Sequence, residues 1–111
     1  MKPEEELAAL DEKERVMLEG ARASMNGEAL LDEEDRIHDQ IRREYYELLR
    51  SNHALAKVVL HQLDEKEKDE IVARYEANPD TPLHTIHFDV RQGTHARYSA
   101  AFAANNNLPL P

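Results

Sequence analysis

The residues best suited to catalysis or metal binding lie near the C-terminal end of the sequence. His84, His87 and His95 surround Asp89, which is the only acidic residue after Asp80. If this region forms strands, His87 and Asp89 share one face, and a tight hairpin brings His95 opposite Asp89. Two histidines and a carboxylate are the ligands of non-haem iron sites and also suit other transition metals. One hypothesis is therefore a small metal-dependent enzyme or accessory subunit that uses His87, Asp89 and His95.

The spacing of these residues is loose, and the competing interpretation is a set of polar pairs on an exposed strand. We favour this second interpretation and predict no cofactor, no metal site and no catalytic residue. The remaining sequence contains no cysteine, no HExxH pattern and only three glycines, none of them in a phosphate-binding loop. Ser24, Ser51 and Ser99 also lack the surroundings of a nucleophile elbow.

The charge of the chain is strongly negative and unevenly distributed. The formal net charge is −9, and all but one of the 23 acidic residues lie in residues 1–80. Such a surface repels phosphate groups, so we expect no direct contact with nucleic acid. The partner that we expect is a protein, and a basic partner would suit this charge.

The acidic run Asp32-Glu33-Glu34-Asp35 permits two interpretations. In the structural one, these carboxylates stabilise the N-terminus of a helix. In the functional one, they imitate the phosphates of nucleic acid, and the protein blocks a DNA- or RNA-binding protein. We favour the structural interpretation and keep the nucleic-acid mimic as an alternative function.

The stretch Leu30–Leu63 contains neither glycine nor proline and dominates the expected fold. Its apolar residues recur mostly at steps of three, four or seven, as in one stripe of an amphipathic helix. We predict a long central helix here, with a break near Ser51 as the alternative because Ser51 or Asn52 can cap a new helix. The residues predicted to form an interaction surface are Ile37, Ile41, Tyr45, Tyr46, Leu48, Leu55 and Val59.

Leu48 lies at the centre of this stripe, and Tyr46 is a candidate anchor because aromatic side chains often dominate interfaces. A chain with few large apolar residues gains stability when a second copy covers such a stripe. We therefore expect a homodimer that forms through the long helix.

Shorter helices are predicted on both sides of this stretch. A helix over Pro3–Met25 has proline in its first turn, and Gly27 begins a tight connection after it. Asp64 is the predicted cap of a helix over Glu65–Ala77, which Asn78-Pro79 ends.

After residue 80 the apolar residues alternate along the chain. Ile86, Phe88 and Val90 form a first alternation, and a second begins at Ala96. This pattern predicts a small β-hairpin over residues 83–102 that closes at residues 91–93, or an extended arm. The competing prediction is a helix over residues 96–104, because alanine favours helices and is depleted in strands.

Together these predictions describe a mainly α fold, either a helical hairpin or a three- to four-helix bundle with a long central amphipathic helix. Residues 1–79 are expected to form an acidic helical domain, residues 80–104 a hairpin or arm packed on it, and residues 105–111 a flexible tail. The predicted function is a non-enzymatic protein–protein interaction module, such as a small acidic adaptor, regulator or inhibitor. The absence of cysteine and of a long apolar segment predicts a cytoplasmic protein without membrane contact.

Overall fold

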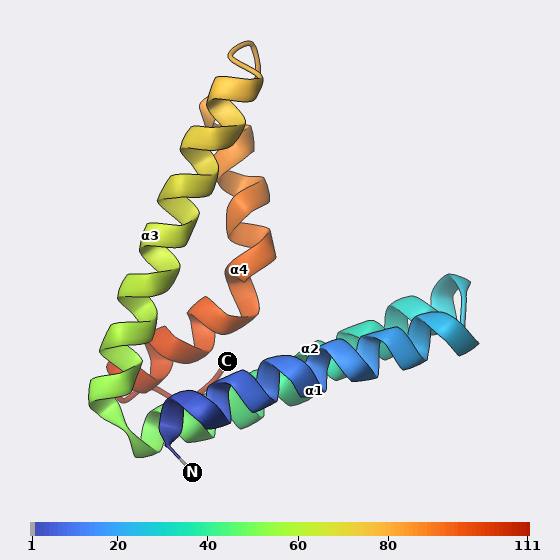
Figure 1. The fold of residues 1–111 in the computed structure, drawn as a ribbon, viewed down its shortest axis with the longest axis vertical. Helices are drawn as coiled ribbons and strands as arrows, with labels where there is room; N and C mark the ends of the chain where they lie inside the picture. Colours follow the sequence, from blue (N-terminus) through green and yellow to red (C-terminus); the bar gives the residue numbers. More distant parts are fainter. Residues whose placement is uncertain (1) are drawn as a thin grey trace.

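Helices make up nearly all of the computed structural model, which describes residues 2–111 (Figure 1). The four helices within this range are α1 (Pro3–Ser24), α2 (Gly27–Ser51), α3 (His53–Ala77) and α4 (Leu83–Asn105). No strand occurs in this part of the chain. The prediction of a mainly α fold is confirmed. None of the helices between residues 2 and 111 is apolar over a stretch long enough to cross a membrane.

Local sequence signals set both ends of α1. Pro3 occupies its first turn together with three glutamates, whose charge complements the positive end of the helix. After Ser24 the chain turns sharply, and Gly27 begins α2 with a φ angle of 60°. Residues with a side chain are strained in this left-handed region, so glycine is suited to the turn. Both features agree with the sequence-based prediction.

The predicted long central helix over Leu30–Leu63 is wrong, because the helix is interrupted at Asn52. The backbone at Asn52 is not helical, and its side-chain oxygen accepts a hydrogen bond from the Leu55 amide at 3.2 Å. Asn52 therefore caps α3, as the alternative prediction of a break had allowed. The predicted cap at Asp64 does not exist, since α3 continues through this position from His53 to Ala77.

The predicted β-hairpin over residues 83–102 is also wrong, because these residues belong to one helix, α4. An alternation with a period of two also places apolar residues four apart, which is close to one helical turn. Ile86 and Val90 satisfy both patterns and are buried in α4, whereas Phe88 points to solvent. The helix satisfies its own backbone hydrogen bonds, while an isolated two-stranded hairpin is only marginally stable.

The helices form two arms that meet at one end (Figure 1). α1 and α2 lie side by side in one arm, and α3 with the first part of α4 forms the other. α4 then changes direction and passes behind the junction, where both termini also lie. α2 contacts each of the other three helices, so it is the element on which both arms are built.

The main core lies at this junction. It combines aromatic and aliphatic residues of α2 and α3 with four alanines of α4, and its buried members are Tyr45, Tyr46, Leu49, Leu55, Ala56, Val59, Ala100, Ala101, Ala103 and Ala104. α4 thus shares a core with helices on the other side of the domain boundary predicted at residue 79. A smaller cluster of Ala21, Ile37 and Ile41 joins α1 to α2.

The residues after α4, expected to form a flexible tail, turn back onto α2. The Leu108 amide donates to the carbonyl of Ala103 at 2.8 Å, and Tyr46 Oη donates to the carbonyl of Leu108 at 2.6 Å. Leu110 packs against the main core, and the Arg42 guanidinium donates to the carbonyl of Pro111 at 3.3 Å. Hydrogen bonds and apolar burial therefore hold this segment in place.

The fully buried leucine near the end of α2 is Leu49 rather than the predicted Leu48. Leu49 has no exposed surface, whereas Leu48 is partly exposed. We expect Leu49→Ala to lower the free energy of unfolding by about 2–5 kcal/mol, because it leaves a cavity in the core. Urea denaturation followed by circular dichroism measures this change. The matched control is Leu31→Ala, which removes a leucine that is 62% exposed and should change stability by less than about 0.5 kcal/mol.

Candidate interaction surface

Most of the predicted interaction residues face the interior of their own chain. Those that are buried are Ile37, Ile41, Tyr45, Tyr46, Leu55 and Val59, while Leu48 is partly exposed. Their partners are α1, α3, α4 and the C-terminal segment rather than solvent. The hydroxyl of Tyr46, the predicted anchor, donates a hydrogen bond to the carbonyl of Leu108. The buried side chains among these residues therefore build the fold of one chain, and their predicted role in contacts with another protein stays a prediction.

The structure does not bring the three predicted metal ligands together. His87, Asp89 and His95 are all exposed on α4. His87 and Asp89 are two residues apart on a helix, so their side chains are about 200° apart around its axis and point to nearly opposite sides. Within residues 2–111 no group of three histidine, aspartate or glutamate side chains is arranged to hold a metal ion. The hairpin geometry on which the metal hypothesis depended is absent.

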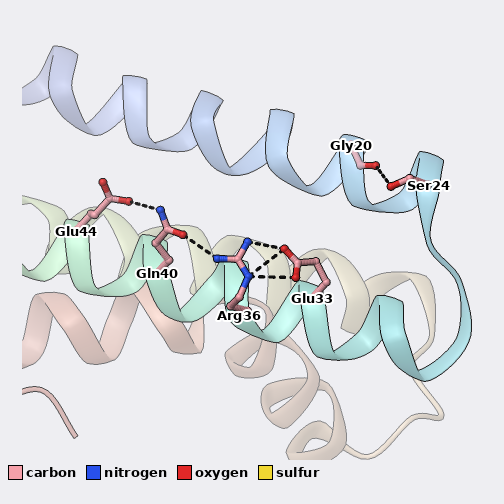
Figure 2. Close-up of polar contacts among 6 residues, drawn as sticks. All are labelled: Gly20, Ser24, Glu33, Arg36, Gln40 and Glu44. Carbon is pink, nitrogen blue, oxygen red and sulfur yellow. Dashed lines mark hydrogen bonds and ion pairs between the residues drawn. The ribbon is translucent and has the colours of Figure 1, made fainter.

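The acidic run at the start of α2 is partly neutralised by neighbouring cations. Arg36 pairs with Glu33 and donates to Gln40 at 3.1 Å, and Gln40 donates to Glu44 at 3.5 Å, so that a polar ladder follows α2 (Figure 2). Glu34 pairs with Arg22 of α1 at 3.0 Å. The predicted stabilisation of the helix N-terminus is not what these contacts show, because the run lies beyond the first turn of α2, where the acidic residue is Glu28. The role of the run as a nucleic-acid mimic stays a prediction.

Arg97 links α1 to α4 across the junction. Its guanidinium pairs with Asp11 and, at 2.9 Å, with Glu14, both of which belong to α1. The same guanidinium lies 5.8 Å from the centre of the Tyr45 ring. The second carboxylate oxygen of Glu14 lies 3.1 Å from His38 of α2. One arginine of α4 therefore connects the two helices of the first arm.

The outward face of α4 carries a regular row of aromatic, histidine and arginine side chains. We call it the outer stripe, and its members are His84, Phe88, Arg91, His95, Tyr98 and Phe102. The steps between them alternate between four and three residues, which is the spacing of the a and d positions of a coiled coil. All six are at least partly exposed, and Phe88 is 63% exposed. No acidic residue belongs to the stripe.

Contacts among its own members keep the outer stripe ordered. The Arg91 guanidinium lies 3.8 Å from the centre of the Tyr98 ring, and the rings of Tyr98 and Phe102 stack with centres 6.5 Å apart. Arg91 also donates to Glu67 of α3 at 2.7 Å. Glu67 is only 5% exposed, and its other carboxylate oxygen has no hydrogen-bond partner in the chain. Because a buried carboxylate needs a cation, Glu67 holds Arg91 in place.

Two hollows adjoin the stripe and share His87 and Arg91. One, of about 660 Å³, lies on α4 beside Leu83 and Phe88. The other, of about 250 Å³, lies between α3 and α4 and is lined in part by Ile71 and Val72. Apolar surface therefore continues from the outer stripe across to α3. Aromatic and arginine side chains beside such hollows are typical of the centres of protein interfaces.

This surface is not apparent from the sequence when residues 83–102 are predicted to form strands. The six members of the outer stripe follow steps of four, three, four, three and four, whereas His87 and Arg97, which belong to the same residue types, fall outside this spacing. Steps of three and four residues place side chains on one face of a helix but not on one face of a strand. The prediction of strands therefore gave no reason to group these residues.

Comparison of the chain with known protein families, with characterised proteins and with solved structures finds no match.

Because the Tyr45 ring is buried, the stability of the junction is expected to fall at alkaline pH. Removal from water raises the pKa of Tyr45 to about 12, with Arg97 opposing this shift and Asp11 adding to it. In the unfolded chain the tyrosine pKa is about 10. The neutral phenol therefore contributes stability that is complete below about pH 10 and is lost as the pH rises through the folded-state value.

We expect the difference in unfolding free energy between the unaltered chain and Tyr45→Phe to be constant below about pH 10 and to shift against the unaltered chain at higher pH. Urea denaturation of both proteins at a series of pH values measures this difference. A difference that stays constant up to pH 12 would contradict the burial of this phenol.

Proposed function

We propose that this protein is a non-enzymatic protein–protein interaction module that associates with a second copy of itself. The observation that supports the proposal most directly is the extent of its surface. The chain exposes 7374 Å², whereas a compact monomer of its mass is expected to expose about 6,300 Å². The surplus of about 1,100 Å² is similar to the roughly 800 Å² that each partner buries in a standard interface.

The open shape of the molecule accounts for this surplus. The radius of gyration is 15.6 Å, compared with about 13 Å for a compact chain of this length. Because the two arms meet only at one end, the sides of both arms remain open to water (Figure 1). A small chain that leaves this much surface uncovered gains stability when a partner covers part of it.

The composition of the uncovered surface supports a protein as the partner. The large apolar side chains that remain exposed on α3 and α4 include Val72, Tyr75, Leu83, Phe88 and Phe102. Burying such side chains contributes about 25 cal/mol per Å² of apolar area. An adaptor, a regulator and an inhibitor would each use a surface of this kind.

Self-association predicts the mass of the protein in solution. Light scattering coupled to gel filtration should give about twice the chain mass of 12.8 kDa at micromolar concentration. Dilution should shift this mass toward the monomer, because association depends on concentration. A mass of one chain at every concentration up to the millimolar range would disprove self-association.

A further inference from the structure

The small hollow between α3 and α4 contains a buried carboxylate that the chain uses only in part. Glu67 lines this hollow of about 250 Å³, and its side chain is 6% exposed. Its Oε2 accepts a hydrogen bond from Arg91 at 2.7 Å, whereas its Oε1 has no hydrogen-bond partner within residues 2–111. A buried acceptor without a donor costs free energy, so a ligand that donates to Oε1 is favoured.

Asp39 on α2 shows that one carboxylate of this chain can hold two cations. One of its oxygens pairs with Arg42 at 2.8 Å and the other with Arg43 at 3.0 Å. Glu67 is more deeply buried than Asp39, whose side chain is 47% exposed, yet only one oxygen of Glu67 is paired. The free oxygen of Glu67 is therefore suited to a second cation.

The neighbouring side chains of the hollow do not supply this cation. Lys68 follows Glu67 directly, and adjacent residues of a helix do not face each other. His87 lines the hollow from α4 but forms no hydrogen bond with Oε1. The hollow therefore leaves a position for the cation of another molecule.

The lining of the hollow favours an ammonium group on an aliphatic chain. Only one acceptor is free, which suits the compact ammonium of lysine better than the two-pronged guanidinium of arginine. Ile71 and Val72 provide apolar walls along which a lysine can lay its carbon stem. Asp64 adds a second carboxylate to the lining, and the net charge of −9 attracts cations. We infer that the hollow binds the lysine side chain of a partner protein, with the ammonium group donating to Glu67 Oε1.

The larger hollow indicates what accompanies this lysine in the partner. It shares His87 and Arg91 with the lysine site and is also lined by Leu83 and Phe88. An apolar side chain next to the lysine would cover this surface. The inference rests on the proposed role in protein–protein interaction and names the chemistry of the partner, but it does not depend on self-association.

Three small probes test the charge that the site requires. n-Butylammonium reproduces the lysine side chain, 1-butanol replaces its charge with a hydroxyl group, and butanoate carries the opposite charge. Each is titrated into the unaltered protein while NMR records the methyl signals of Ile71 and Val72. We expect saturable shifts with n-butylammonium, about tenfold or more weaker binding of 1-butanol, and no binding of butanoate. Equal affinities for n-butylammonium and 1-butanol, or no saturable shift with either, would overturn the inference.

A pair of variants tests whether Glu67 is the acceptor. Glu67→Gln keeps the size of the side chain but removes its charge, and should weaken n-butylammonium binding by about tenfold or more. The matched control is Asp69→Asn, which removes a charge from an exposed position of the same helix and should leave the affinity nearly unchanged. Equal affinities in the two variants would exclude Glu67. If circular dichroism shows that Glu67→Gln has unfolded, the three probes on the unaltered chain still decide.

A lysine derivative tests the assignment to a protein partner. Nα-acetyl-lysine methylamide carries the side chain as a polypeptide does, and its Nε-acetylated form is the control without charge. We expect the first to shift the same methyl signals and the second to leave them unchanged. Binding of n-butylammonium without binding of Nα-acetyl-lysine methylamide would overturn the assignment to a protein. Because light scattering measures self-association separately, a monomeric chain that binds the lysine derivative would disprove the homodimer and leave this site intact.

Discussion

The structure depends on the close approach of α4 to α2 and α3 through four alanines. Ala100, Ala101, Ala103 and Ala104 are all buried, and none has a side chain that would hold the helices apart. Their small size leaves room for the rings of Tyr45 and Tyr46 in the same core. The contacts of α4 with both helices are much more extensive than the contacts between α2 and α3. Without this packing the two arms would share little more than the short connection at Asn52.

This dependence on a single junction explains why the molecule is open. The arms share a core only where α4 passes the end of α2, and polar contacts continue the connection outward. Arg97 pairs with two acids of α1, and Tyr46 holds the segment that follows α4. Farther along the second arm, the buried residues are few and include Glu67, whose charge requires Arg91. A small chain with this layout has much of its side-chain surface in water.

α4 has two faces with different compositions, and this difference connects the fold to the proposed function. Its inward face consists of small or branched residues that allow close packing in one chain. Its outward face carries Phe88, Tyr98 and Phe102 with histidines and an arginine, which pack well against another protein. The Glu67–Arg91 pair spans both environments, because it joins α3 to α4 and also orients the outer stripe.

The sequence by itself determined the all-helical character of most of the chain and several helix ends. Proline at the start of α1, Gly27 after it and Asn78-Pro79 after α3 act through local backbone geometry, which requires no tertiary contact. The apolar spacing of Ile37, Ile41 and Tyr45 identified the buried side of α2, and the structure confirms that all three are buried.

Only the tertiary structure decided the break at Asn52, the helix over Leu83–Asn105 and the face of α4 that remains exposed. Local preferences allowed two outcomes in each case, since apolar residues four apart suit both a strand and a helix. Packing of the alanines against α2 selected the helix, and that choice placed the outer stripe on the surface.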